Sequence, residues 1–162
     1  MRKFMSLCMA LLVGFLMPQI VQAAEVLPEA VNGKITLTED VTLTSAIVVE
    51  SGKNITLDLA GFTLKNDTSL KADTIYVKKG ATLKLTGNGT VINTTEGYAA
   101  LYNNGTTVID GATLKRDTTG DNNYYVILNH GNMTIEDANV SVNGTGSSLV
   151  ENGYYDFTST DE

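Results

Sequence analysis

Cysteine and positive charge are both scarce in this sequence of 162 residues. Cys8 is the only cysteine, so a disulfide within the chain is excluded. The 11 basic residues are outnumbered by 18 acidic residues, and the net charge of −7 argues against nucleic acid or an anionic membrane as the main partner. Only 18% of the residues are charged and 43% are hydrophobic, which excludes a disordered acidic chain. The length suits a single domain.

Residues 1–23 have the pattern of a secretory signal peptide. Arg2 and Lys3 precede an apolar run over residues 4–17, and small residues precede a cleavage site after Ala23. The apolar run is too short to span a membrane. We therefore expect an exported protein, secreted or held at the cell surface, that does not insert into a membrane after cleavage; the alternative is that this segment is retained as an N-terminal anchor.

Short β-type runs separated by Gly and Asn repeat about every 25 residues beyond residue 32. Alignment of these runs places aliphatic residues in two columns. The first column contains Leu59, Leu85, Ile109 and Ile135, and the second contains Leu64, Val91, Leu114 and Val140. A fixed period in this range is typical of repeat architectures.

The repeat has no sustained helical periodicity, which excludes repeats built from helices. Each period instead holds two or three short runs joined by tight turns rich in Gly and Asn, residues that tolerate the positive φ of a sharp corner. These features predict a solenoid in which like strands of successive coils stack into parallel sheets. We expect an all-β fold of about five to six short coils.

A further run in each period ends in glycine, and its inward face is open to two interpretations. Alignment on the closing glycines, Gly52, Gly80, Gly105, Gly131 and Gly153, leaves two apolar columns. The favoured inward column contains Val49, Val77, Tyr102, Leu128 and Val150. The alternative column contains Val48, Tyr76, Leu101, Ile127 and Leu149.

Strings such as ALYNNGTTVIDGATL (100–114) resemble the right-handed parallel β-helix of the pectate-lyase-like superfamily, and more narrowly the secreted adhesive β-helix repeat proteins of bacteria. The resemblance covers residues 33–157. It implies that residues 24–32 form an N-terminal cap with a short turn of helix. No counterpart closes the far end before the acidic tail 158–162, so we expect an open C-terminal end, explained either by truncation of a longer protein or by end-to-end self-association.

The resemblance also indicates which catalytic residues to look for. Hydrolases on this scaffold resemble one another in four sequence motifs, which are N-x-D, D-D, G-H-G and R-x-K. Asn129-His130-Gly131 approaches the third element, but the sequence has no Asp-Asp pair and no Arg-x-Lys. His130 is therefore interpreted as a turn residue, and Lys115 with Arg116 as a solvated charge pair. No catalytic residue is predicted.

One carboxylate group follows from the alignment. Asp110 and Glu136 share a column, and Asp137 follows directly. Stacked coils would hold the first two about 5 Å apart, where like charges repel unless a cation or proton lies between them. Such oxygen ligands suit Ca²⁺. The alternative is that these are exposed turn acids pointing apart in water; no other cofactor is expected.

Three tyrosines, Tyr98, Tyr124 and Tyr125, lie in the variable loops between the columns. Exposed tyrosines offer flat apolar area with a polar tip, which suits stacking on sugar rings; partial packing against the coil beneath is the alternative. We therefore expect a non-catalytic, adhesin-like module that binds polysaccharide or a cell-surface target. The alternatives are a truncated relative of a pectate lyase or glycoside hydrolase acting on acidic polysaccharide, and a structural β-helix segment that assembles through its open end.

Overall fold

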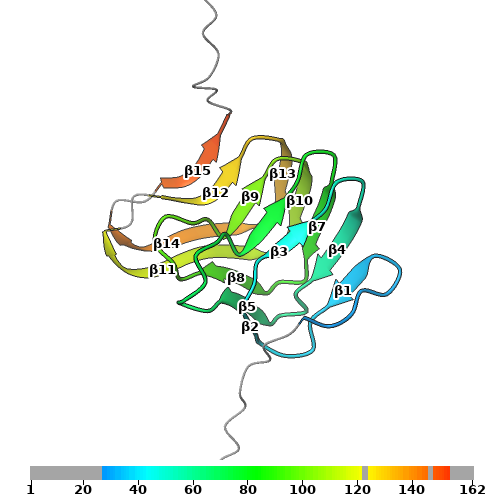
Figure 1. Ribbon diagram of the computed structural model, residues 1–162, viewed down its shortest axis with the longest axis horizontal. Coiled ribbons are helices and arrows are strands. Elements are labelled where there is room, and N and C mark those ends of the chain that lie inside the picture. The colour runs from blue at the N-terminus through cyan, green and yellow to red at the C-terminus, as the bar shows by residue number, and fades with distance from the viewer. Residues whose placement is uncertain (1–26, 122–123, 146–147, 154–162) are drawn as a thin grey trace, which may run out of the picture.

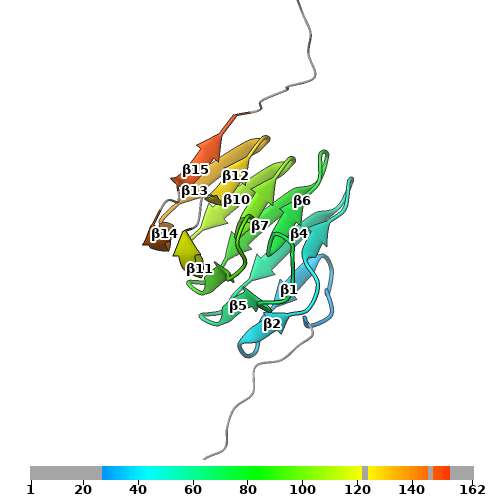
Figure 2. The ribbon, with the colours of Figure 1, turned by 60° about the vertical axis from the view of Figure 1, so that its left-hand side comes forward.

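The computed structural model describes residues 27–121, 124–145 and 148–153. The expected signal peptide and the acidic tail therefore lie outside the described residues. The described chain forms a parallel β-solenoid of about four turns, slightly fewer than expected (Figures 1 and 2). The described residues contain no helix, and so none that could cross a membrane.

Three parallel sheets of five strands each form the walls of the solenoid. The first sheet contains β1 (Lys34–Thr36), β4 (Asn54–Asp58), β7 (Thr82–Thr86), β10 (Thr106–Asp110) and β13 (Asn132–Glu136). The second contains β2 (Val41–Leu43), β5 (Thr63–Asn66), β8 (Thr90–Asn93), β11 (Thr113–Asp121) and β14 (Asn139–Thr145). The third contains β3 (Ile47–Val49), β6 (Ile75–Val77), β9 (Leu101–Asn103), β12 (Tyr125–Asn129) and β15 (Ser148–Asn152). Three consecutive strands make one level, and the five levels, which are joined by about four turns of the solenoid, stack along its axis as Figure 2 shows.

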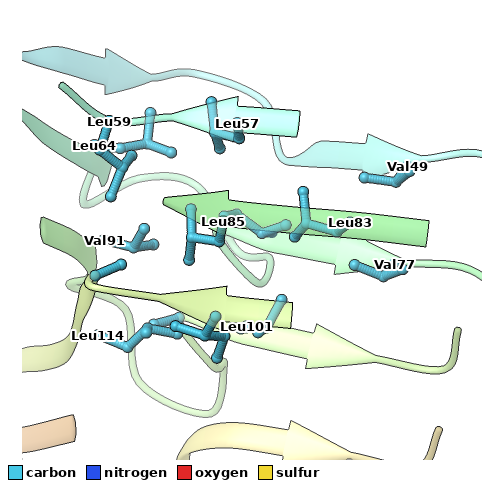
Figure 3. Close-up of a cluster of buried hydrophobic side chains, with 14 of the residues drawn as sticks. Val49, Leu57, Leu59, Leu64, Val77, Leu83, Leu85, Val91, Leu101 and Leu114 are labelled. Carbon is cyan, nitrogen blue, oxygen red and sulfur yellow. The ribbon is translucent and has the colours of Figure 1, made fainter. Parts of the chain in front are cut away.

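The core fills the space between the sheets because alternate residues of each strand point inward. In β7, Leu83 and Leu85 are fully buried, whereas Lys84 between them is exposed. Figure 3 shows buried side chains of successive levels lying one above another. The predicted second-sheet column is confirmed by the strand register. It runs through Val41, Leu64, Val91, Leu114 and Val140.

The predicted first-sheet column is right in three levels and wrong in one. Leu57, not Leu59, is in register with Leu85. The connection that follows β4 spans residues 59–62 and is longer than the later connections, so an alignment without a gap slips by two residues. Leu59 is nevertheless fully buried, and its backbone N–H donates to Thr86 O at 2.8 Å.

The favoured inward column of the third sheet is wrong at the third and fourth levels, whereas Val49, Val77 and Val150 do face inward. Tyr102 is in register with the outward-facing Tyr76, and Leu128 with Tyr102. The inward residues are instead Ile47, Ile75, Leu101, Ile127 and Val150, followed two positions later by Val49, Val77, Asn103, Asn129 and Asn152.

Unequal turns explain this error. The connection from the third sheet to the first spans residues 50–53 and 78–81 in early levels but only 104–105 and 130–131 later. The closing glycines are therefore not equivalent. Gly80 has a φ of +78°, a conformation that side chains disfavour. A Cβ on Gly105 would collide with Ala81 O and Lys78 O of the level below, so that glycine permits close stacking.

Asparagine side chains form a ladder at the short turns, and two of its members, Asn103 and Asn129, are buried. Asn103 Nδ2 donates to Asn129 Oδ1 at 2.7 Å, and Asn129 Nδ2 donates to Asn152 Oδ1 at 2.6 Å. Asn103 Oδ1 also accepts from Gly105 N at 3.1 Å and from Thr107 Oγ1 at 2.8 Å. The ladder thus satisfies polar groups of the two-residue turn and links successive levels at this corner.

The two ends of the solenoid differ. At the first level, residues 27–33 do not form the expected turn of helix; Val31 and Lys34 instead make an antiparallel bridge, and Leu27 packs against the core. At the last level, β13, β14 and β15 each have a strand partner on one side only among the described residues. Ile135 is 44% exposed and Val150 is 41% exposed there.

Replacing Asn103 by alanine should remove both the donor and the acceptor functions of the ladder. Because Thr107 Oγ1, Asn129 Oδ1 and the Gly105 N–H would lose a buried partner, we expect a loss of about 3 kcal/mol in the free energy of unfolding. Urea unfolding measures this loss. Asn139→Ala, at an exposed position, is the matched control and should change stability little. Equal losses in both variants would contradict the structural role of the ladder.

Candidate functional site

The outer face of the third sheet carries a column of large side chains. Val48, Tyr76, Tyr102 and Leu128 occupy equivalent positions in four successive levels. The rings of Tyr76 and Tyr102 stack with their centroids 5.0 Å apart and an interplanar angle of 27°. This separation matches the distance of about 4.8 Å between neighbouring strands, so strand pairing itself aligns the rings.

Turn residues of the next level hold the hydroxyl groups of both tyrosines. Asn104 Nδ2 donates to Tyr76 Oη at 3.1 Å. The Tyr102 hydroxyl lies 3.2 Å from His130 Nδ1. The imidazole and the Tyr102 ring are T-shaped, with their centroids 5.3 Å apart. Each ring is therefore fixed by stacking and by one hydrogen bond at its tip. The His130 position confirms its interpretation as a turn residue.

A groove of about 350 Å³ lies beside this aromatic stack. Its floor is formed by outward residues of the third sheet, and its wall comes from the connections before β6 and β9. The lining residues are Ala46, Val48, Lys71, Ala72, Asp73, Tyr76, Tyr98 and Tyr102. The groove thus combines aromatic rings and small apolar side chains with one amine and one carboxylate.

Two buried asparagines at the end of the second sheet hold the wall in place. Asn66 Oδ1 accepts from Thr94 N at 2.7 Å, and Asn66 Nδ2 donates to Thr95 Oγ1 at 2.7 Å. Asn93 Nδ2 donates to Ala72 O at 3.1 Å and to Ala99 O at 3.0 Å. These bonds satisfy backbone groups of connections that cross the face of the sheet, so the wall is preorganised.

Asp73 joins the two connections that form the wall. Its Oδ1 accepts from Ala99 N at 2.7 Å. Partial burial raises the pKa of the Asp73 carboxyl, although the Ala99 hydrogen bond and the charge of Arg116 act in the opposite direction. The carboxylate is therefore an acceptor held in a partly desolvated position.

Arg116 lies behind the wall and is fully buried, which corrects its interpretation as a solvated charge. It is in register with Asn93, so it continues the polar column of that corner. Its Nη2 donates to Thr95 O at 2.9 Å, and its guanidinium carbon lies 5.6 Å from the centre of the Tyr124 ring. Its Nε and Nη1 atoms have no hydrogen-bond partner within the described part of the chain. Burial accordingly lowers the pKa of Arg116.

The structure brings only one of the three predicted tyrosines into the groove. Tyr98 lines it, whereas Tyr124 and Tyr125 are not among its lining residues and lie with their rings 5.4 Å apart. Tyr76 and Tyr102 were missed as site residues because the face of their strand could not be assigned. The available signal was that each tyrosine directly follows an aliphatic residue, Ile75 or Leu101, in successive periods.

The predicted carboxylates lie on the first sheet, away from the residues of the groove. Asp110 and Glu136 are in register on adjacent strands, as expected. The Asp110 carboxylate, however, lies 3.1 Å from Lys84 Nζ, and Asp137 lies in the following turn with a φ of +46°. The described residues contain no group of three or more His, Cys, Asp or Glu side chains that could hold a metal ion. The structure therefore adds no ligand to the predicted Ca²⁺ site.

No protein-family model, curated protein or solved structure matches this chain.

Replacing Asp73 by asparagine should stabilise the fold at neutral pH. Since the folded-state pKa of Asp73 is raised, ionisation opposes folding, and this destabilisation is absent at acid pH and develops as the pH rises through the carboxyl pKa. The asparagine Oδ1 can still accept from Ala99 N. We expect a higher Tm for Asp73→Asn at pH 7 and a smaller difference at pH 3, measured by thermal unfolding.

Asp67→Asn, in the same connection, provides a control of opposite sign. Hydrogen bonds from the Ser69 hydroxyl and backbone N–H lower the pKa of Asp67, so its carboxylate favours folding above the unfolded pKa. That variant should have a lower Tm at pH 7 and regain the wild-type value at acid pH. A lower Tm for Asp73→Asn at pH 7 would show that Arg116 outweighs the burial of Asp73.

Proposed function

We propose that this protein is a non-catalytic binding module that holds a carbohydrate chain in the groove on its third sheet. The observation that carries the proposal is the stack of Tyr76 and Tyr102, whose rings are fixed beside the groove. A pyranose ring has apolar C–H faces and polar hydroxyl edges. Tyrosine rings match such faces, while Lys71 can donate to the hydroxyl groups and Asp73 can accept from them.

The content of the groove favours binding over hydrolysis. Most glycoside hydrolases use two carboxyl groups on either side of the bond that they cleave. Asp73 is the only carboxylate among the residues that line the groove. The missing Asp-Asp and Arg-x-Lys motifs support the same conclusion.

The proposed location is outside the cell or on its surface, and the target is a polysaccharide or a cell-surface glycan. Two features support it: the signal-peptide pattern of residues 1–23, which lie outside the described residues, and the resemblance of residues 33–157 to secreted adhesive β-helix repeat proteins. A parallel β-solenoid is compatible with that resemblance, although the scaffold alone does not define a function.

Binding to an array of neutral and acidic oligosaccharides tests the proposal. Tyr76→Ala and Tyr102→Ala should each weaken binding of the strongest array ligand by about tenfold or more, because the first removes the stacking surface and the second removes the ring that holds Tyr76 in place. The double variant Tyr124→Ala with Tyr125→Ala is the matched control, since neither residue lines the groove.

Three results would contradict the proposal. Wild-type protein that binds no glycan would exclude it. Loss of binding in the Tyr124 and Tyr125 variant alone would move the site to the loop tyrosines. A rise in ultraviolet absorbance on polygalacturonate with Ca²⁺ would indicate a lyase instead.

We infer a second candidate function, head-to-tail self-association, from the open last level. Exposed aliphatic residues, and strand edges that have no partner among the described residues, form a surface at this end on which another level can pair. Within the described residues the last member of the ladder is the exposed Asn152. The occupant that we propose is the first level of a second copy, because Ile35 and Val41 belong to the same inward columns as Ile135 and Val140. Such a head-to-tail contact is heterologous and can extend into filaments.

Sedimentation velocity over a range of protein concentrations tests self-association. We expect wild-type protein to form larger species as the concentration rises. Val150→Lys should abolish them, because it places a charge on the exposed inward column of the last level. Thr134→Lys, an exposed outward position on β13, should not. Wild-type protein that stays monomeric at every concentration would exclude this function.

A further inference from the structure

The aromatic stack on the third sheet has an unfilled position at the first level. Val48 pairs in register with Tyr76 in the same way as Tyr76 pairs with Tyr102. A ring at the Val48 position would therefore continue the stack at the spacing of about 4.8 Å between strands. Because valine has no ring, the face of Tyr76 that is turned away from Tyr102 has no aromatic partner in the column.

The groove lies at this unfilled position. Ala46 and Val48, both from the first level, are among its lining residues, and Val48 is 41% exposed. Small side chains at the first level beside tyrosines at the second and third create a step in the surface. The volume of about 350 Å³ is near the lower end of the range of about 300 to 1,000 Å³ for ligand pockets, which suits one or two sugar residues rather than a longer stretch.

The chemistry of the groove is divided in the same way as that of a sugar ring. Ala46, Val48 and Ala72 are apolar, whereas Lys71 and Asp73 supply a donor and an acceptor on the wall. Asp73 is held by Ala99 N, so its direction is fixed before a ligand arrives. A ring that stacks on Tyr76 would thus have its hydroxyl edge near two polar groups.

We propose that one hexopyranose residue of the bound glycan occupies the third position of the stack, over Val48 and against the open face of Tyr76. This inference rests on the proposed carbohydrate-binding function and adds the position and class of the ligand ring. The ring requires one face free of axial hydroxyl groups, because a hydroxyl on that face would separate it from Tyr76 and lose its hydration. Val48 is then a specificity-determining residue, since its small side chain leaves room for the ligand.

Filling the position with a side chain tests the proposal. Val48→Tyr places a tyrosine at an exposed position of a strand, where aromatic side chains are favourable. There the new ring continues the stack and excludes the ligand. We expect its affinity for the strongest array oligosaccharide, measured by titration calorimetry, to fall by about tenfold or more while the Tm does not fall. Val48→Thr keeps a β-branched side chain of similar size and should retain wild-type affinity.

A second measurement needs no variant. In methyl NMR spectra of the wild-type protein, addition of the same oligosaccharide should shift the Val48 methyl signals more than those of valines in the core, such as Val91. These methyl shifts test whether the ligand lies over Val48 even if Val48→Tyr fails to fold.

The possible failures are distinguishable. Wild-type binding that Val48→Tyr leaves unchanged, or Val48 methyl signals that do not move, would overturn this inference and leave the carbohydrate-binding function standing. Loss of binding in both Val48 variants would overturn it as well, since a filled position would not be the cause. Wild-type protein that binds no oligosaccharide would overturn the function and the inference together.

Discussion

In-register hydrogen bonding between parallel strands is the constraint on which the rest of this structure depends. Each strand pairs with the strand one turn later, so equivalent side chains lie about 4.8 Å apart along the axis. Equivalent positions must then accommodate similar chemistry. Aliphatic residues stack inside, asparagines stack at the corners, and tyrosines stack on the outer face. Each level buries its inward face only against its neighbours, so stability accumulates along the stack.

Asparagine has different roles at two corners of the solenoid. Between the third and first sheets, the ladder through Asn103 and Asn129 closes turns of only two residues by bonding to their backbone. Between the second and third sheets, Asn66 and Asn93 satisfy the backbone of long connections that cross the sheet. The groove depends on this second role, because without those amides the wall would have unpaired polar groups and no fixed path. Arg116 continues the same column with a charge that is only partly satisfied within the described residues.

The sequence predicted the class of fold and much of the core but little of the candidate site. The Leu64 column was assigned correctly, and the strand register bears it out at every level. Leu59 and Tyr102 were misplaced for one reason: a turn that gains or loses residues shifts the alignment without changing the pattern of apolar residues. A shift of one residue moves a side chain to the opposite face of the sheet. Tyr102 was therefore predicted in the core, although it lies beside the groove.

The amino-acid sequence by itself determined that the chain repeats, that its repeats are strands, and that its stability does not depend on disulfides. These properties follow from local periodicity and composition, which can be read from the sequence without knowing which strands pair. Only the tertiary structure decided which face each third-sheet residue occupies, that Arg116 is buried, and that Val48, Tyr76 and Asp73 share one groove. The physical reason is that register between levels is set by backbone pairing across a whole turn, and the residues of the groove come from connections that meet only once that pairing has formed.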